Sequence, residues 1–219
     1  MKRVLLWIPN YDWKISYKMW LFLNKLIVPT DIKLEIKFVV RWIITEARNE
    51  LMNYALHEKF DYLWFLDDDV IPNIDILENF SESDENIITW LVRKRSEPHN
   101  ICVYKRLENN LDYKPLEAEE LPTLLTKVDV CWCWCVFIER KVMEYMTKTY
   151  KSPFEFKEVF YKKDKDWFYI EHPTGSISKK VWEDILFFER VNMAWFDIYA
   201  DITMDCIHLS EEFLELKID

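Results

Sequence analysis

Glycine is nearly absent from this chain, and its scarcity restricts what the chain can fold into and bind. The 219 residues contain one glycine, Gly175, whereas average usage of about 7% would give roughly fifteen. A P-loop and a GxGxxG dinucleotide-binding turn both need several glycines, because the backbone approaches the phosphates closely there. Any nucleotide that this chain binds must therefore be held without a glycine-rich loop.

Composition indicates one folded domain with an acidic surface. Half of the residues are hydrophobic and 31% are charged, which supplies enough apolar surface for a sizeable core. The 39 Asp and Glu residues outnumber the 29 Lys and Arg residues, giving a formal net charge of -10. Such a surface repels a phosphate backbone, so we expect no nucleic-acid partner.

Apolar runs in the chain are short. Val4–Ile8 ends at Pro9 and is too short for the core of a signal peptide. Val128–Ile138 falls well below the roughly 20 residues that a membrane-spanning helix needs. The sequence therefore predicts no membrane span and a cytoplasmic protein.

The cysteines fit an intracellular compartment. Cys131, Cys133 and Cys135 alternate with two tryptophans, a pattern that predicts one strand with the three sulfurs on the same face. Neighbours on one face of a strand lie roughly 6.5 Å apart, too far for a disulfide. We expect buried free thiols rather than disulfides or a metal site.

Strand-like and helix-like segments alternate in the first third. Val4–Ile8 and Tyr62–Leu66 are continuous apolar runs, typical of strands that are buried on both faces. Between them we predict a helix in Trp13–Val28, a strand at Leu34–Val40 and a second helix capped by Thr45. This βαβαβ order predicts a parallel sheet with crossover helices.

The rest of the chain is less regular, and we predict further strands, two helices and two loops there. The expected strands are Ile87–Val92, Ile101–Tyr104, Val128–Ile138 and Phe196–Ile202, the helices 140–149 and Trp182–Val191, and the loops Asn109–Pro122 and 151–181, the last long and mobile.

Three adjacent carboxylates follow the buried strand Tyr62–Leu66. Asp67, Asp68 and Asp69 repel one another unless a cation or hydrogen-bond donors compensate. Ligands of open α/β sheets bind at the carboxyl ends of strands. In an extended segment Asp67 and Asp69 point the same way and converge on one divalent ion. The alternative is an acidic turn exposed to water.

Two other positions have titratable groups placed for chemistry. Glu183 and Asp184 open a predicted helix, where the helix dipole favours an ionised carboxylate that can act as a general base or simply begin the helix. His208 follows the last predicted strand, where a lone histidine is commonly structural.

Taken in order, these segments resemble a GT-A glycosyltransferase of the family 2 type. The resemblance extends over residues 4 to 210, and its motifs are individually short. It rests on Leu6–Tyr11, on Glu46–Leu51 with Asp61–Asp69, on Val128–Arg140, and on Trp182–Phe187 with Ile207–Leu209.

The resemblance implies an α/β fold with a single GT-A domain over residues 1–219, in which a mostly parallel central sheet is flanked by helices. Residues 1–92 would form the nucleotide-binding half with the DxD motif, and residues 93–219 the acceptor and catalytic half. The implied activity is metal-dependent transfer of a sugar from a nucleotide-diphosphate sugar to an acceptor hydroxyl, with inversion at the anomeric carbon.

On the donor side, the resemblance assigns Pro9 and Tyr11 to the nucleobase pocket and Arg48 to the nucleotide or its diphosphate. Asp67 would hold the ribose or the metal.

On the chemical side, the resemblance implies that Asp69 ligates Mn²⁺ or Mg²⁺ together with Asp67, and that His208 approaches the same metal. Asp184 would deprotonate the acceptor hydroxyl.

The chain also departs from the family pattern. Cys131–Cys135 stands where the family usually has glycines, which narrows or reshapes the sugar pocket, and no acidic residue ends the strand at Val39–Arg41, where many members contact uracil. Two alternatives stay open, a nucleotidyltransferase and a non-catalytic binding or structural protein on the same scaffold. Compact chains of this type occur in cells and in viruses, archaeal viruses included, so a viral origin with a host-cytoplasm location is a further hypothesis.

Overall fold

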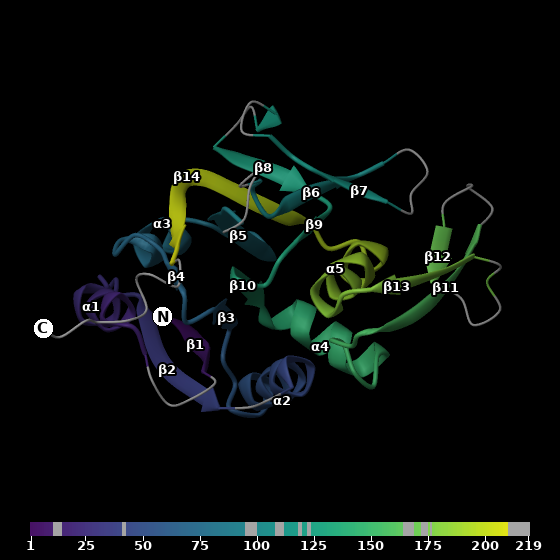
Figure 1. Ribbon diagram of the computed structural model, residues 1–219. Helices are drawn as coiled ribbons and strands as arrows, with labels where there is room; N and C mark the ends of the chain where they lie inside the picture. The colour runs from purple at the N-terminus through teal and green to yellow at the C-terminus, as the bar shows by residue number, and fades with distance from the viewer. Residues whose placement is uncertain are drawn as a thin grey trace, which may run out of the picture.

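The computed structural model is a mixed α/β fold built on a large central sheet (Figure 1). It describes residues 1–10, 15–40, 43–94, 100–107, 112–117, 120–121, 124–163, 169–171, 175 and 177–209. The strands of the central sheet are β1 (Lys2–Asn10), β2 (Ile32–Val40), β3 (Tyr62–Leu66), β4 (Val70–Ile71), β5 (Ile87–Val92), β8 (Leu125–Val128), β10 (Cys135–Glu139) and β14 (Ile198–His208). Their order is β2-β1-β3-β10-β5-β14-β4, and β8 also pairs with β14.

The strands from the N-terminal part of the chain, β1, β2 and β3, pair in parallel. β1 pairs in parallel with both β2 and β3, and the connections contain α1 (Tyr17–Lys25) and α2 (Ile44–His57). β5 and β14 are also parallel, whereas β10 runs antiparallel to β3 and β5. The predicted βαβαβ order and the predicted α/β class, a mostly parallel central sheet flanked by helices, are therefore confirmed.

Helices cover both faces of the sheet, which explains the continuous apolar runs. Besides α1 and α2 they are α3 (Ile76–Ser81), α4 (Arg140–Thr149) and α5 (Glu183–Met193). In β1, Val4 and Leu6 pack with α1 and α3, while Leu5 and Trp7 pack with α2, α4 and α5. Because neighbouring side chains of a strand point to opposite faces, each of these residues lies in a core.

Two small antiparallel sheets complete the described chain. One is β12 (Tyr169–Glu171), β11 (Lys157–Lys163) and β13 (Ile177–Val181), in that order. The prediction of an irregular loop over 151–181 is therefore wrong in its secondary structure, because Val159 and Tyr161 bury one face of β11 against α5. Gly175 lies against this strand: an added Cβ would be 2.4 Å from the carbonyl oxygen of Tyr161.

The second small sheet has the order β7-β6-β9 and consists of β6 (Val103–Arg106), β7 (Tyr113–Pro115) and β9 (Val130–Cys131). The strand predicted at Ile101–Tyr104 thus begins later and joins a separate sheet, touching the end of β5 through one bridge between Arg93 and Ile101. Part of the loop predicted at Asn109–Pro122 is the strand β7.

Two other local predictions are wrong. The single strand expected at Val128–Ile138 is divided among β8, β9 and β10, so Cys131 and Cys133 enter one core cluster and Cys135 the other. All five cysteines are nevertheless buried and free, as predicted. Thr45 does not cap α2, which begins after Ile43 without a side-chain cap.

An aromatic cluster on the α1 and α3 side of the sheet allows a test of this core. Phe137 stacks on Trp64 and Phe80, with ring centroids 4.7 and 4.1 Å apart. We expect Phe137→Ala to lower the free energy of unfolding by about 3–5 kcal/mol, because it removes a buried ring and leaves a cavity. Urea denaturation measures the loss. Phe160→Ala, at a ring that is 42% exposed, is the control and should change stability by about 0.5 kcal/mol or less; equal losses would contradict this packing.

Candidate functional site

A cavity of about 310 Å³ opens at the carboxyl ends of β1 and β3. This volume lies in the range of small-molecule sites. The lining residues are Pro9, Ile44, Arg48, Asp67, Asp68, Asp69, Trp132, Trp134, Trp182, Glu183 and Asp184. Five residues that the sequence singles out, Pro9, Arg48, Asp67, Asp69 and Asp184, therefore share one cavity. Tyr11, the other predicted donor contact, lies outside the described residues.

The acidic triplet forms a tight turn rather than the extended segment expected from the sequence. The amide of Val70 donates to the carbonyl of Asp67 at 3.0 Å, which closes the turn between β3 and β4. The amide of Asp67 in turn donates to the carbonyl of Trp134. Asp68 accepts a hydrogen bond from the side chain of Asn10, at the end of β1. The turn is thus tied to β1 and to the segment before β10.

The end of β14 places His208 beside this turn. His208 is opposite Val70 in an antiparallel pair, and the amide of Leu209 donates to the carbonyl of Asp69 at 2.7 Å. As a result, Nε2 of His208 lies 3.6 Å from Oδ1 of Asp69. The imidazole ring also packs on Trp134, with centroids 4.7 Å apart. The predicted association of His208 with the acidic triplet is present, although 139 residues separate the two in sequence.

The His208 ring is oriented as in a metal-ligating histidine. Its Nδ1 lies 2.9 Å from the carbonyl oxygen of Arg93, which only accepts, so Nδ1 carries a proton and Nε2 faces Asp69. No three His, Cys, Asp or Glu side chains of the described residues form a metal-binding cluster. A pair such as Asp69 and His208 fits an ion that keeps waters and takes its other ligands from substrate phosphates.

Arg48 lies in the cavity wall, near both Asp67 and the start of α5. It projects from α2, is 3% exposed, and donates from Nη1 to Oε1 of Glu183 at 2.7 Å. Glu183 and Asp184 form the first turn of α5, and Oδ1 of Asp184 accepts from the amide of Ile185 at 2.8 Å. Asp184 is itself only 3% exposed. The ion pair therefore fixes the start of α5 against α2.

Burial and like charges shift the acids of this wall in the same direction. Burial raises the pKa of Asp67 to about 7; Arg48 opposes the shift, and neighbouring Asp68, Asp184 and Glu183 add to it. Burial also raises the pKa of Asp184, with Arg48 again opposing. For Arg48, burial alone would lower the pKa, but the surrounding acids raise it, so its charge persists. The cavity thus contains one arginine that stays charged and two carboxyl groups, of Asp67 and Asp184, whose pKa values are raised.

Two polar atoms at this wall are buried without a hydrogen-bond partner. They are Nε of Arg48 and Oδ1 of Asp67. An unsatisfied buried donor or acceptor is costly, and such atoms commonly find partners in a bound ligand or ion. The cavity wall therefore has donor and acceptor capacity that the folded chain leaves unused.

Tryptophans form the apolar part of the cavity. Trp132 and Trp134 lie with ring centroids 4.8 Å apart, and the indole of Trp132 donates to the hydroxyl of Tyr104. Trp182, which is 61% exposed, packs beside Phe156 at 5.2 Å. The segment Cys131–Cys135 thus contributes two rings to the cavity.

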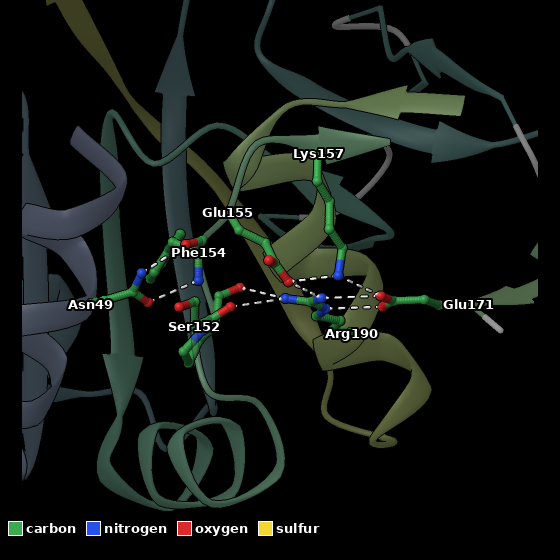
Figure 2. A network of polar contacts seen from close by, with 8 residues as sticks. Asn49, Ser152, Phe154, Glu155, Lys157, Glu171 and Arg190 are labelled. Carbon is green, nitrogen blue, oxygen red and sulfur yellow. Dashed lines mark hydrogen bonds and ion pairs between the residues drawn. The ribbon is translucent and has the colours of Figure 1, made fainter. Parts of the chain in front are cut away.

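A segment between α4 and β11 joins the two helices that carry Arg48 and Asp184 (Figure 2). On the α2 side, Asn49 donates to the carbonyl of Phe154 at 2.7 Å and accepts from its amide at 2.9 Å. The Phe154 ring stacks on Phe187 of α5, with centroids 4.1 Å apart and planes 8° apart. Phe154 is therefore a second link between α2 and α5, besides the ion pair of Arg48 and Glu183.

Arg190 holds the other side of this segment (Figure 2). Its guanidinium is buried in α5 and donates to the carbonyls of Ser152 and Pro153, each at 3.1 Å. It also pairs with the carboxylates of Glu155 and Glu171, and Lys157 bridges the same two acids. Every side of the guanidinium thus has a partner, as a buried arginine requires.

Three supports of the site, Asn49, Phe154 and Arg190, are not predicted from the sequence. One feature points to Arg190: it lies beside the apolar residues Phe187, Phe188 and Val191 in the predicted helix Trp182–Val191. A charge in such a stripe indicates a buried ion pair, but its partners come from distant loops that no local pattern identifies.

Comparisons with known proteins concern the fold. No family model and no curated protein matches the chain. Among solved structures, A197 from STIV matches with a TM-score of 0.59 at 20% identity, over 96% of this chain and 87% of that one. The inositol-1-phosphate CTP transferase from T. maritima matches with a TM-score of 0.47 at 9% identity, over 100% and 93%. A glycosyltransferase involved in the glycosylation of the major capsid of PBCV-1 reaches 0.34 at 9% identity, over 65% and 62%.

At 20% identity and a TM-score of 0.59, the match to A197 from STIV shows a shared fold and nothing finer. Membership of the family that the sequence resembles stays a prediction. Among the described helices, none has the length and hydrophobicity needed to cross a membrane.

Because the pKa of Asp67 is raised, replacing this residue by a neutral one should stabilise the fold, and by more at higher pH. The folded chain prefers a protonated Asp67 up to about pH 7, whereas the unfolded chain ionises near its ordinary value of 3.8. The destabilising charge therefore develops as the pH rises between these values and is fully present above pH 7. We expect Asp67→Asn, in EDTA, to raise the melting temperature over wild type more at pH 8 than at pH 5.

The matched control for this experiment is Asp84→Asn, the same chemical change at a fully exposed side chain. It should leave the melting temperature nearly unchanged at both pH values. An Asp67→Asn gain that is equal at pH 5 and pH 8 would show that Asp67 is not buried as an unfavourable charge.

Proposed function

We propose that this chain is a metal-dependent glycosyltransferase that moves a sugar from a nucleotide-diphosphate sugar to an acceptor hydroxyl. The observation that carries the proposal is the single cavity that gathers Arg48, the Asp67–Asp69 turn and Asp184 from three separate elements. The cavity is lined by the guanidinium of Arg48, by the carboxylates of the acidic turn and of the start of α5, and by three tryptophan rings. These are the groups that a phosphate-activated, hydroxyl-rich substrate needs.

The acidic turn is the proposed donor side. Three carboxylates facing one cavity would repel a diphosphate, so a divalent cation, Mn²⁺ or Mg²⁺, is needed to offset the charges when the donor binds and when its diphosphate departs. Asp69 and His208 are the proposed ligands of that cation. Asp67 is the third ligand that the family resemblance implies, although the described structure does not cluster it with the other two. Pro9, at the end of β1, and Tyr11 are the proposed contacts of the nucleobase, and Arg48 the contact of the diphosphate.

Asp184 is the proposed general base. It needs to accept the proton of the acceptor hydroxyl while that oxygen attacks the anomeric carbon and the nucleotide diphosphate leaves from the opposite face, which inverts the configuration. Burial raises the pKa of Asp184 and makes it a stronger base than an exposed carboxylate. Arg48 opposes this shift and favours the ionised form that a base requires.

Two substitutions separate the proposed donor and base roles. Asp184→Asn should keep metal-dependent binding of the donor and lose transfer by about a hundredfold or more, because an amide cannot take the proton. Asp69→Asn should weaken metal-dependent donor binding itself. Calorimetric titration of nucleotide-diphosphate sugars with Mn²⁺, followed by assay of nucleoside diphosphate release, measures both effects.

Asp205→Asn is the control, since this acid lies three residues before His208 and pairs only loosely with Arg93 at 3.9 Å. Its binding and turnover should equal those of wild type. A fully active Asp184→Asn enzyme would refute the assignment of the base. The metal site would be refuted if wild type bound the donor equally well with and without EDTA and Asp69→Asn bound it as tightly as wild type.

A further inference from the structure

The strand at one edge of the central sheet, β2, has no partner strand on its outer side among the described residues. β2 contains nine residues, and it pairs only with β1. A long exposed edge invites another strand, because its backbone amides and carbonyls on that side have no ladder to join. The side chains of Ile36 and Phe38 on this strand are each 39% exposed. This edge lies apart from the cavity of the proposed function.

The register with β1 determines which backbone groups of β2 face outward. Lys2 pairs with Ile32, and its amide donates to the carbonyl of Asp31. In a parallel ladder with this register, Glu35 and Lys37 direct their amides and carbonyls toward β1. Those of Leu34, Ile36 and Phe38 therefore point away from the sheet, where an additional strand would meet them.

We propose that β2 pairs antiparallel with β2 of a second copy of this chain, with Ile36 on the two-fold axis. Ile36 is the central residue of the strand, so this register pairs all nine residues of β2. It also sets Ile36 opposite Ile36 and Leu34 opposite Phe38 of the other copy as hydrogen-bonded pairs. Each outward amide and carbonyl at these positions then has a partner, which is the pattern of an antiparallel ladder.

The charges of β2 favour a second copy as the occupant of this edge. In the same register, Glu35 of each copy lies directly opposite Lys37 of the other, and opposite charges at such positions attract. Lysines on an edge strand ordinarily discourage pairing, but Glu35 between Lys33 and Lys37 makes the strand complementary to itself. Centring the pair one residue away, on Glu35 or Lys37, would instead set two like charges face to face.

Glu35 and Lys37 are already aligned on one face of the strand. Nζ of Lys37 lies 3.2 Å from the ring centroid of Tyr54 in α2, and the Tyr54 hydroxyl donates to Glu35 at 3.4 Å. Tyr54 thus holds both charges on the α2 side of the sheet, while Leu34, Ile36 and Phe38 share the other side. The paired strand therefore has a charged face and an apolar face, each matched to its copy.

Charge reversal tests this pairing without touching the cavity. In sedimentation velocity, we expect wild type to dimerise, and Glu35→Lys or Lys37→Glu each to raise the dimer dissociation constant by about tenfold or more, since two attractive pairs become repulsive. The double variant, Glu35→Lys with Lys37→Glu, restores the attraction and should dimerise like wild type. Lys33→Glu, opposite Val39 in this register, is the matched control and should change little.

Mixing the two single variants gives the sharpest outcome. The Glu35→Lys chain has lysine at both positions 35 and 37, and the Lys37→Glu chain has glutamate at both. The proposal therefore requires the two variants to form a heterodimer more tightly than either forms a homodimer. Circular dichroism confirms that each variant is folded. A wild-type chain that stays monomeric up to about 1 mM, unchanged dimerisation of both single variants, or a mixture without heterodimer would each overturn the proposal.

Discussion

The buried pair of Arg48 and Glu183 is the interaction on which the site depends. It joins α2 to the first turn of α5, and it places the one buried cation of the cavity beside Asp67 and Asp184. A buried charge without a partner costs several kcal/mol, so α5 can begin at Glu183 only if this end of the helix stays against α2. The position of the proposed base thus follows from an electrostatic requirement of the fold.

The Arg48–Glu183 pair is held in place by polar contacts of one irregular segment, residues 152–155 between α4 and β11. Asn49 holds the backbone of Phe154, and Arg190 holds the two carbonyls before it together with Glu155. The Phe154 ring also lies near Arg48, with 5.7 Å between ring centroid and guanidinium carbon. Substitutions in this segment would therefore displace the cavity wall without removing any residue that faces the cavity.

The sequence predicted what depends on local periodicity and failed where distant contacts decide. β1, β3 and α2 follow from apolar runs and helical spacing. The family resemblance implied that the acidic triplet, Asp184 and His208 act together, but the tight turn of the triplet was not predicted. The strands β11, β12 and β13 were missed, because they bury only a small apolar cluster against α5 and join the ion pairs of Arg190 through Lys157 and Glu171. The cysteine and tryptophan alternation suggested one strand, but the chain turns at Cys133 and Trp134 so that both tryptophan rings enter the cavity.

A thermal-shift measurement can decide whether the acidic cavity binds an anionic donor through a divalent cation. Wild type would be heated with UDP-, GDP-, CDP- and ADP-sugars, each with Mn²⁺ and again with EDTA. A ligand at 100 times its dissociation constant adds about 2.7 kcal/mol, or roughly 5–10 °C in a chain of this size. We expect such a shift with Mn²⁺ and its loss with EDTA. Flat curves for every donor, or equal shifts in EDTA, would contradict it.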